Sequence, residues 1–100
     1  MENIVYLQLR KKYQDVYYYK TVEDYEVDFF VPKERVLIQV SQHFDAPATQ
    51  ERELRAIVRA AKDEKKTKNL IIVTESEKSE IERENLQIQV IPLYEWLLWD

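Results

Sequence analysis

The chain has 100 residues, which is the length of one domain. Cysteine and glycine are absent and His43 is the only histidine, so disulfide scaffolds, zinc–thiolate sites, His-rich metal clusters and glycine-rich phosphate loops are excluded. The net charge of −4 argues against general nucleic-acid binding, although basic residues concentrate at 10–12 and 62–68.

The beginning of the chain fits two secondary structures. Ile4, Val5 and Leu9 have the spacing of a helix, whereas Val5, Leu7 and Leu9 alternate as in a strand. The segment that follows, 16–21, is rich in tyrosine and predicts the first certain strand.

The next two segments predict a hairpin. Residues 25–31 and 36–41 both alternate, and the Pro-Lys-Glu-Arg segment between them is typical of a turn. We expect one face of this hairpin to be apolar throughout, formed by Val27, Phe29, Val31, Val36, Ile38 and Val40.

The period changes in the second half of the chain. Apolar residues at i, i+3, i+4 and i+7 predict an amphipathic helix over 54–61, with its first turn near Asp45 and Pro47. A buried strand over 70–74 follows, then a polar loop or short helix over 76–84. The chain closes with a strand at 88–91 and a short helix carrying Leu93, Trp96 and Leu97.

This order predicts one three-layer α/β domain over 1–100. The sheet is expected to be mixed and five-stranded: an antiparallel meander of three strands, then a right-handed helical crossover to a parallel fourth strand, with helices on its faces.

The hairpin also predicts a candidate site. If Val31 pairs with Val36, then Asp28 lies opposite Gln39, and Glu26 lies opposite Ser41. Acids at such positions would hold a divalent metal, and a lysine would help to activate water.

These residues carry a resemblance to a known family. Glu26 to Phe30, placed about ten residues before Ile38 to Ser41, resembles the PD-(D/E)XK nuclease motif, and the element order is similar to the restriction-endonuclease-like fold. More closely, the chain resembles the nuclease-like C-terminal domain found behind an AAA-type ATPase domain in uncharacterised bacterial and archaeal proteins. The segments that carry this likeness are 2–7, 17–20, 26–29 and 88–98. The resemblance implies that the chain begins with a helix.

The resemblance also implies an incomplete catalytic site. Asp28 matches the first acid of the family, and Glu2 matches the acid that the first helix sometimes supplies. Gln39 replaces the second acid and Ser41 replaces the lysine, so the metal would lose a charged ligand and the reacting phosphate would lose an ammonium group.

We therefore expect a decayed nuclease that acts in recognition or assembly, with an ATPase domain of the same or another chain, or another protein, as its partner. The domain is then either excised from a longer protein or a lone relative. No cofactor is expected unless activity survives on Mg²⁺ or Mn²⁺.

Two alternatives stay open. One is an active nuclease in which Glu26 and Lys20 substitute for the missing groups, and the other is a DNA-binding module without catalysis. Because no apolar stretch approaches the ~20 residues of a membrane span and the first residues are not basic, we expect a cytoplasmic protein away from membranes.

Overall fold

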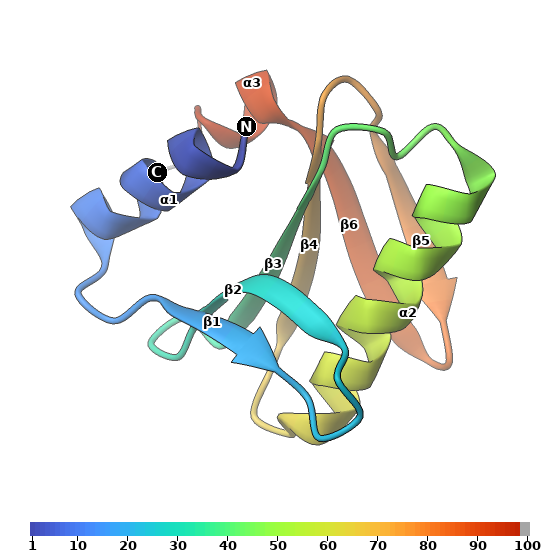
Figure 1. Ribbon diagram of the computed structural model, residues 1–100. Coiled ribbons are helices and arrows are strands. Elements are labelled where there is room, and N and C mark those ends of the chain that lie inside the picture. Colours follow the sequence, from blue (N-terminus) through green and yellow to red (C-terminus); the bar gives the residue numbers. More distant parts are fainter. Residues whose placement is uncertain (99–100) are drawn as a thin grey trace.

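The computed structural model describes residues 1–98, which form a mixed sheet with helices on both faces (Figure 1). The helices are α1 (Glu2–Lys12), α2 (Pro47–Asp63) and α3 (Leu93–Trp96). The strands are β1 (Tyr17–Lys20), β2 (Glu26–Val31), β3 (Val36–Ser41), β4 (Asn69–Thr74), β5 (Ser79–Arg83) and β6 (Leu86–Pro92). Across the sheet their order is β1-β2-β3-β4-β6-β5. Within residues 1–98, no helix has the length and apolar composition needed to cross a membrane.

The predicted core topology is confirmed. β1, β2 and β3 form an antiparallel meander, and α2 then connects β3 to β4, which pairs with it in parallel. β6 also runs parallel to β4. The ambiguous start is helical, because Val5 and Leu9, one turn apart, are both buried, whereas Leu7 is 54% exposed.

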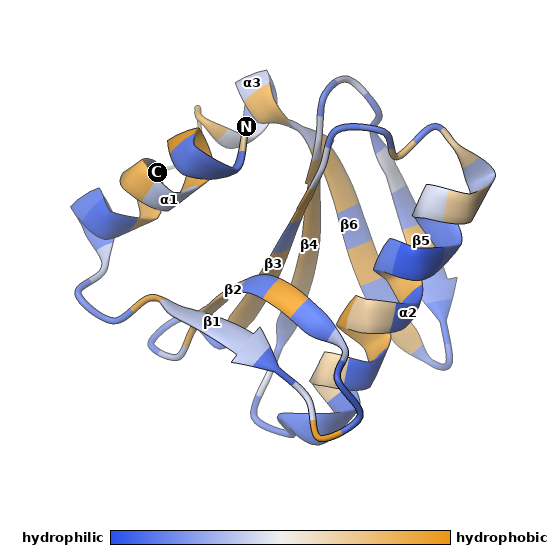
Figure 2. Ribbon diagram, in the orientation of Figure 1, coloured by the Kyte–Doolittle hydropathy of each residue, from blue (hydrophilic) through white to orange (hydrophobic). Residues whose placement is uncertain are grey.

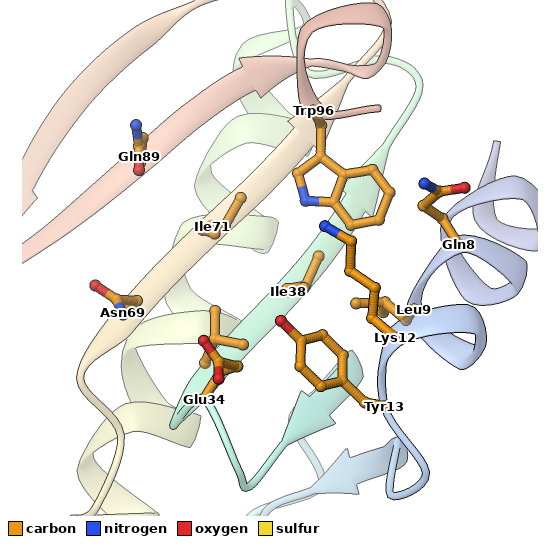
Figure 3. A pocket seen from close by; sticks show the side chains of 11 residues that line it. Gln8, Leu9, Lys12, Tyr13, Glu34, Ile38, Asn69, Ile71, Gln89 and Trp96 are labelled. Carbon is orange, nitrogen blue, oxygen red and sulfur yellow. The ribbon is translucent and has the colours of Figure 1, made fainter. Parts of the chain in front are cut away.

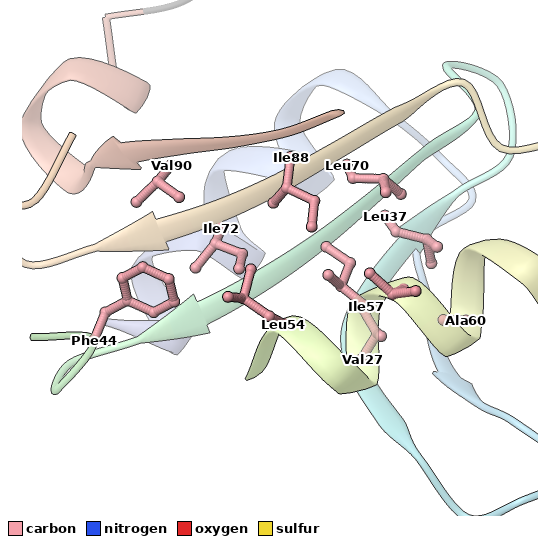
Figure 4. Close-up of a cluster of buried hydrophobic side chains, with 11 residues drawn as sticks. Val27, Leu37, Phe44, Leu54, Ile57, Ala60, Leu70, Ile72, Ile88 and Val90 are labelled. Atoms are coloured by element: carbon pink, nitrogen blue, oxygen red, sulfur yellow. The ribbon is translucent and has the colours of Figure 1, made fainter. Parts of the chain in front are cut away.

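Two apolar clusters hold the three layers together. The central strands β3 and β4 are hydrophobic on both faces, and the inner side of α2 is hydrophobic as well (Figure 2). One cluster lies between the sheet and α2 and contains Val27, Leu37, Phe44, Leu54, Ile57, Val58, Ala60, Leu70, Ile72, Ile88 and Val90 (Figure 4). The other lies between the sheet and the helices α1 and α3. It contains Val5, Leu9, Phe29, Val31, Val36, Ile38, Ile71, Val73, Ile91 and Trp96.

The prediction of five strands is wrong, because the sheet has six strands in the described residues. Segment 76–84, expected to be a loop or short helix, contains β5, an edge strand that pairs antiparallel with β6. Only Ile81 of this strand is apolar, and it packs against the α2-side cluster. Its hairpin turn is formed by Glu84 and Asn85, both with positive φ, instead of the Asn-Gly pair that usually marks such a turn.

The prediction of one continuous apolar face on β2 is also wrong. Val27 belongs to the α2-side cluster, whereas Phe29 and Val31 belong to the α1-side cluster. The cause is a bulge: Tyr17 pairs with Phe30 but Tyr19 pairs with Val27, so β2 carries one extra residue there. An extra residue reverses the faces on which the neighbouring side chains lie.

The chain has no glycine, so its left-handed turn positions carry residues with a Cβ atom. Within the described residues these are Asp24, Arg35, Glu84 and Asn85. Arg35 closes the β2–β3 turn: its N–H donates to Pro32 O at 3.1 Å, and its carbonyl accepts the N–H groups of Lys68 and Asn69. The left-handed conformation of this non-glycine residue is therefore held by backbone hydrogen bonds.

Replacing Arg35 with glycine should stabilise the fold. Relief of the left-handed conformation outweighs the added entropy of the unfolded chain, for a net gain of about 0.5–1 kcal/mol in the free energy of unfolding. Urea denaturation measures this gain. The matched control is Lys33→Gly in the same turn, because Lys33 is not among the positive-φ residues. Lys33→Gly should lower the stability, and an equal effect of both changes would contradict the explanation.

Candidate functional site

A cavity of about 340 Å³ lies where the carboxyl end of β3 meets the first turns of α1 and α2. Side chains from all three elements meet there, because α2 begins a few residues after β3 and the start of α1 lies beside the same strand end. The carboxyl ends of parallel strands are the common place for sites in α/β proteins. The lining residues are Met1, Glu2, Val40, Ser41, Gln42, His43, Thr49, Arg52 and Glu53.

The Asp28 and Gln39 side chains lie next to this cavity. Each forms a hydrogen bond with the backbone of the strand that carries the other residue. The predicted register is confirmed for Phe29 with Ile38 and for Val31 with Val36. Before Phe29 in β2, no backbone pairing with β3 is present, and side chains form the hydrogen bonds between the two strands. Gln39 Oε1 accepts the Asp28 N–H at 2.8 Å, and Asp28 Oδ2 accepts the Val40 N–H at 2.8 Å.

The other end of the Gln39 amide is also engaged. Its Nε2 donates to the carbonyl oxygen of Glu26 at 3.1 Å and contacts the Glu53 carboxylate at 3.4 Å. Gln39 is 4% exposed, so these bonds satisfy polar atoms that would otherwise be buried without partners. The residue in the place of the second acid thus has a structural role.

Two of the carboxylates gathered here have raised pKa values. Burial raises the pKa of Asp28 to about 6, opposed by the Val40 hydrogen bond and reinforced by Glu2 and Glu53. Burial also raises the pKa of Glu53. Glu2, the acid expected from the first helix, therefore does lie close to Asp28.

Glu53 is the site residue that the sequence analysis missed. Its side chain is 14% exposed, and it pairs with Arg52 at 3.8 Å. The signal was present in the sequence: Glu53 precedes Ile57 by one helical turn, so the apolar stripe of α2 continues into an acid.

Position 41, which the resemblance assigns to a lysine, carries no cationic side chain. Ser41 lines the cavity and is 4% exposed. Among the lining residues, Arg52 supplies a guanidinium group, but its side chain is 71% exposed and pairs with Glu53. His43 also lines the cavity, as an exposed residue.

The expected substitutes, Glu26 and Lys20, do not line the cavity. The Glu26 carboxylate accepts a hydrogen bond from the Tyr18 hydroxyl. Lys20 pairs with Asp24 at 3.4 Å, at the far end of the β1–β2 hairpin.

The donor set does not fit Mg²⁺ or Mn²⁺. Within residues 1–98, no group of three or more His, Asp or Glu side chains is arranged to hold a metal ion. The Gln39 oxygen and one Asp28 oxygen already accept backbone N–H groups, which leaves fewer lone pairs for a cation that takes six or more oxygen ligands.

Asp28→Asn should stabilise the protein at neutral pH. In the folded state the pKa of Asp28 is about 6, against an ordinary value of 3.8, so the native state holds the proton more tightly. Stability therefore falls as the pH rises from about 4 to about 6. Asn removes this loss, worth about 1–2 kcal/mol at pH 7 after discounting for partial exposure.

Thermal melts from pH 4 to pH 7 measure this difference in stability between Asp28→Asn and the wild type. The control, Asp45→Asn at an exposed site, should leave the pH dependence unchanged. A wild-type stability that rises across this range and is unaffected by Asp28→Asn would contradict it.

Comparisons with known proteins identify relatives of this chain. The uncharacterized protein MJ1544 of Methanocaldococcus jannaschii is 33% identical over 108 residues, covering 98% of this chain and 24% of that protein. The chain thus spans about a quarter of the length of this curated relative. No solved structure matches. The family described as a domain of unknown function, DUF4143, matches residues 1–96. The chain therefore belongs to the DUF4143 family.

Proposed function

We propose that the domain has a restriction-endonuclease-like fold whose nuclease centre is inactive, and that it acts in recognition or assembly within a longer protein. The observation that carries the proposal is the state of Gln39. It occupies the place of the second acid, and both ends of its amide are hydrogen-bonded within the protein.

Phosphodiester hydrolysis needs a cation and a group that stabilises the developing negative charge. Here Gln39 offers a neutral oxygen that is already in use, and Ser41 offers a hydroxyl where an ammonium group is needed. Burial, reinforced by the carboxylates of Glu2 and Glu53, raises the pKa of Asp28 to about 6. This chemistry favours a structural role for the former site.

Two observations support a role in recognition or assembly. The matched region makes up 24% of the archaeal relative, so that protein has room for other domains, and the resemblance names an AAA-type ATPase as the neighbouring one. Apolar side chains also remain exposed on the α1 and α3 side of the domain: Ile4 at 47%, Leu7 at 54% and Leu98 at 79%. Such side chains are suited to contact with another domain.

The domain should not cleave DNA. Plasmid and single-stranded DNA, incubated with Mg²⁺ or Mn²⁺ and resolved on a gel, should stay intact. The reason is the absence of both the second acid and the ammonium group.

Cleavage that disappears in Asp28→Ala would overturn the proposal, and cleavage that persists in this variant would indicate a contaminating nuclease. Fluorescence polarisation with the same DNA at about 50 mM salt adds a second result. Strong, salt-sensitive binding without cleavage would assign recognition of DNA in place of a protein partner.

Gln39→Glu should restore metal binding if the site descends from a nuclease. A second carboxylate opposite Asp28 supplies the missing charged ligand, so Mn²⁺ should bind with a dissociation constant of about 1 mM or tighter and raise the melting temperature. Wild-type protein should show neither effect in calorimetry. The matched control is Gln87→Glu, which adds the same charge at an exposed position on β6. Equal Mn²⁺ responses in the two variants would argue against the nuclease resemblance.

A further inference from the structure

A second cavity lies at the other end of α1. It has a volume of about 280 Å³ and opens between the last turns of α1, the first residues of β3 and β4, and α3 (Figure 3). Its floor is apolar and consists of Leu9, Val36, Ile38 and Ile71, each at most 7% exposed. It shares no lining residue with the cavity beside Asp28.

Trp96 lines this cavity with an unused hydrogen-bond donor. The residue is 7% exposed, and within residues 1–98 its indole N–H has no hydrogen-bond partner. Figure 3 shows the nitrogen edge of the ring turned toward the space above Ile71 and Ile38. The indole nitrogen is not fully buried, so it stays open to the cavity, where an acceptor atom of a ligand can bind it in place of water.

The rim of the cavity is rich in carboxamides. The side chains of Gln8, Asn69 and Gln89 lie there, and none of the three makes a hydrogen bond within the described part of the chain. Each carboxamide offers a donor and an acceptor. The Tyr13 hydroxyl joins them, and because burial and then Glu34 raise the pKa of Tyr13, this hydroxyl stays protonated and can donate.

Two residues of opposite charge, Lys12 and Glu34, also line the cavity.

We propose that this cavity binds a nucleobase. The apolar floor suits a flat ring, and the volume, just below the usual range of ligand pockets, suits one ring system. The carboxamides match the adjacent donor and acceptor atoms on a base edge, as Asn and Gln do with adenine in nucleic-acid complexes. The indole N–H donates to a ring nitrogen or carbonyl oxygen of the base. The base arrives on a free nucleoside or as an unstacked base in a single strand, and the chemistry of recognition is the same.

Calorimetric titration with adenosine, guanosine, cytidine and uridine tests the site, with a single-stranded oligonucleotide as a second arm. At least one nucleoside, or the oligonucleotide, should bind with a dissociation constant near or below about 1 mM. Gln89→Ala and Trp96→Phe should each weaken binding about 5- to 10-fold, because each removes one hydrogen bond. Gln87→Ala, two residues earlier on β6 and outside the cavity, should have no effect.

The site is a nucleobase site only if that pattern appears. Absence of binding in both arms, or binding that Gln89→Ala leaves unchanged, would overturn the proposal. Equal binding of benzene, a flat ring without polar edges, would overturn it too. Binding of the oligonucleotide alone, with the same response to the variants, assigns the base to a strand. Because no residue of the first cavity is changed, the result is independent of the cleavage assay.

Discussion

The structure depends on how β2 and β3 stay joined where their backbone pairing ends. The bulge in β2 turns Val27 toward α2 and Phe29 toward α1, so the sheet can feed both apolar clusters. At the same bulge, the backbone pairing between β2 and β3 ends. Gln39 restores the connection because its amide accepts the Asp28 N–H and donates to the Glu26 carbonyl oxygen. Each of these bonds is worth about 1 kcal/mol, and loss of the amide would remove both.

This role explains why glutamine suits position 39 better than an acid does. A carboxylate at position 39 could accept the Asp28 N–H, but it could not donate to Glu26. It would also place another negative charge beside Asp28 and Glu53, whose pKa values are already raised. Without a metal ion, glutamine is therefore the better residue. Glutamine at this position therefore stabilises the pairing of β2 with β3.

The sequence predicted the meander, the parallel crossover and most of the hairpin register, because alternation and the Pro32–Arg35 turn are local signals. It could not predict the bulge, since an extra residue leaves no mark in the alternation of Val27 and Phe29. It missed β5 because the turn at Glu84 and Asn85 contains no glycine. The meeting of Glu2 with Asp28 required the family resemblance, and that of Glu53 with Gln39 required the packing of α2 on the sheet.

The two ends of α1 differ in how their polar groups are used. At the first end, the Asp28 and Gln39 side chains hydrogen-bond to one another's strands, so the polar atoms there hold the fold together. At the second end, the indole N–H of Trp96 and the side-chain amide of the exposed Gln89 have no partners in residues 1–98 and face the cavity. Neither group is shut off from water, so a ligand that binds there replaces water at these donors. Binding chemistry is therefore to be sought at the end where hydrogen bonds are still unmade.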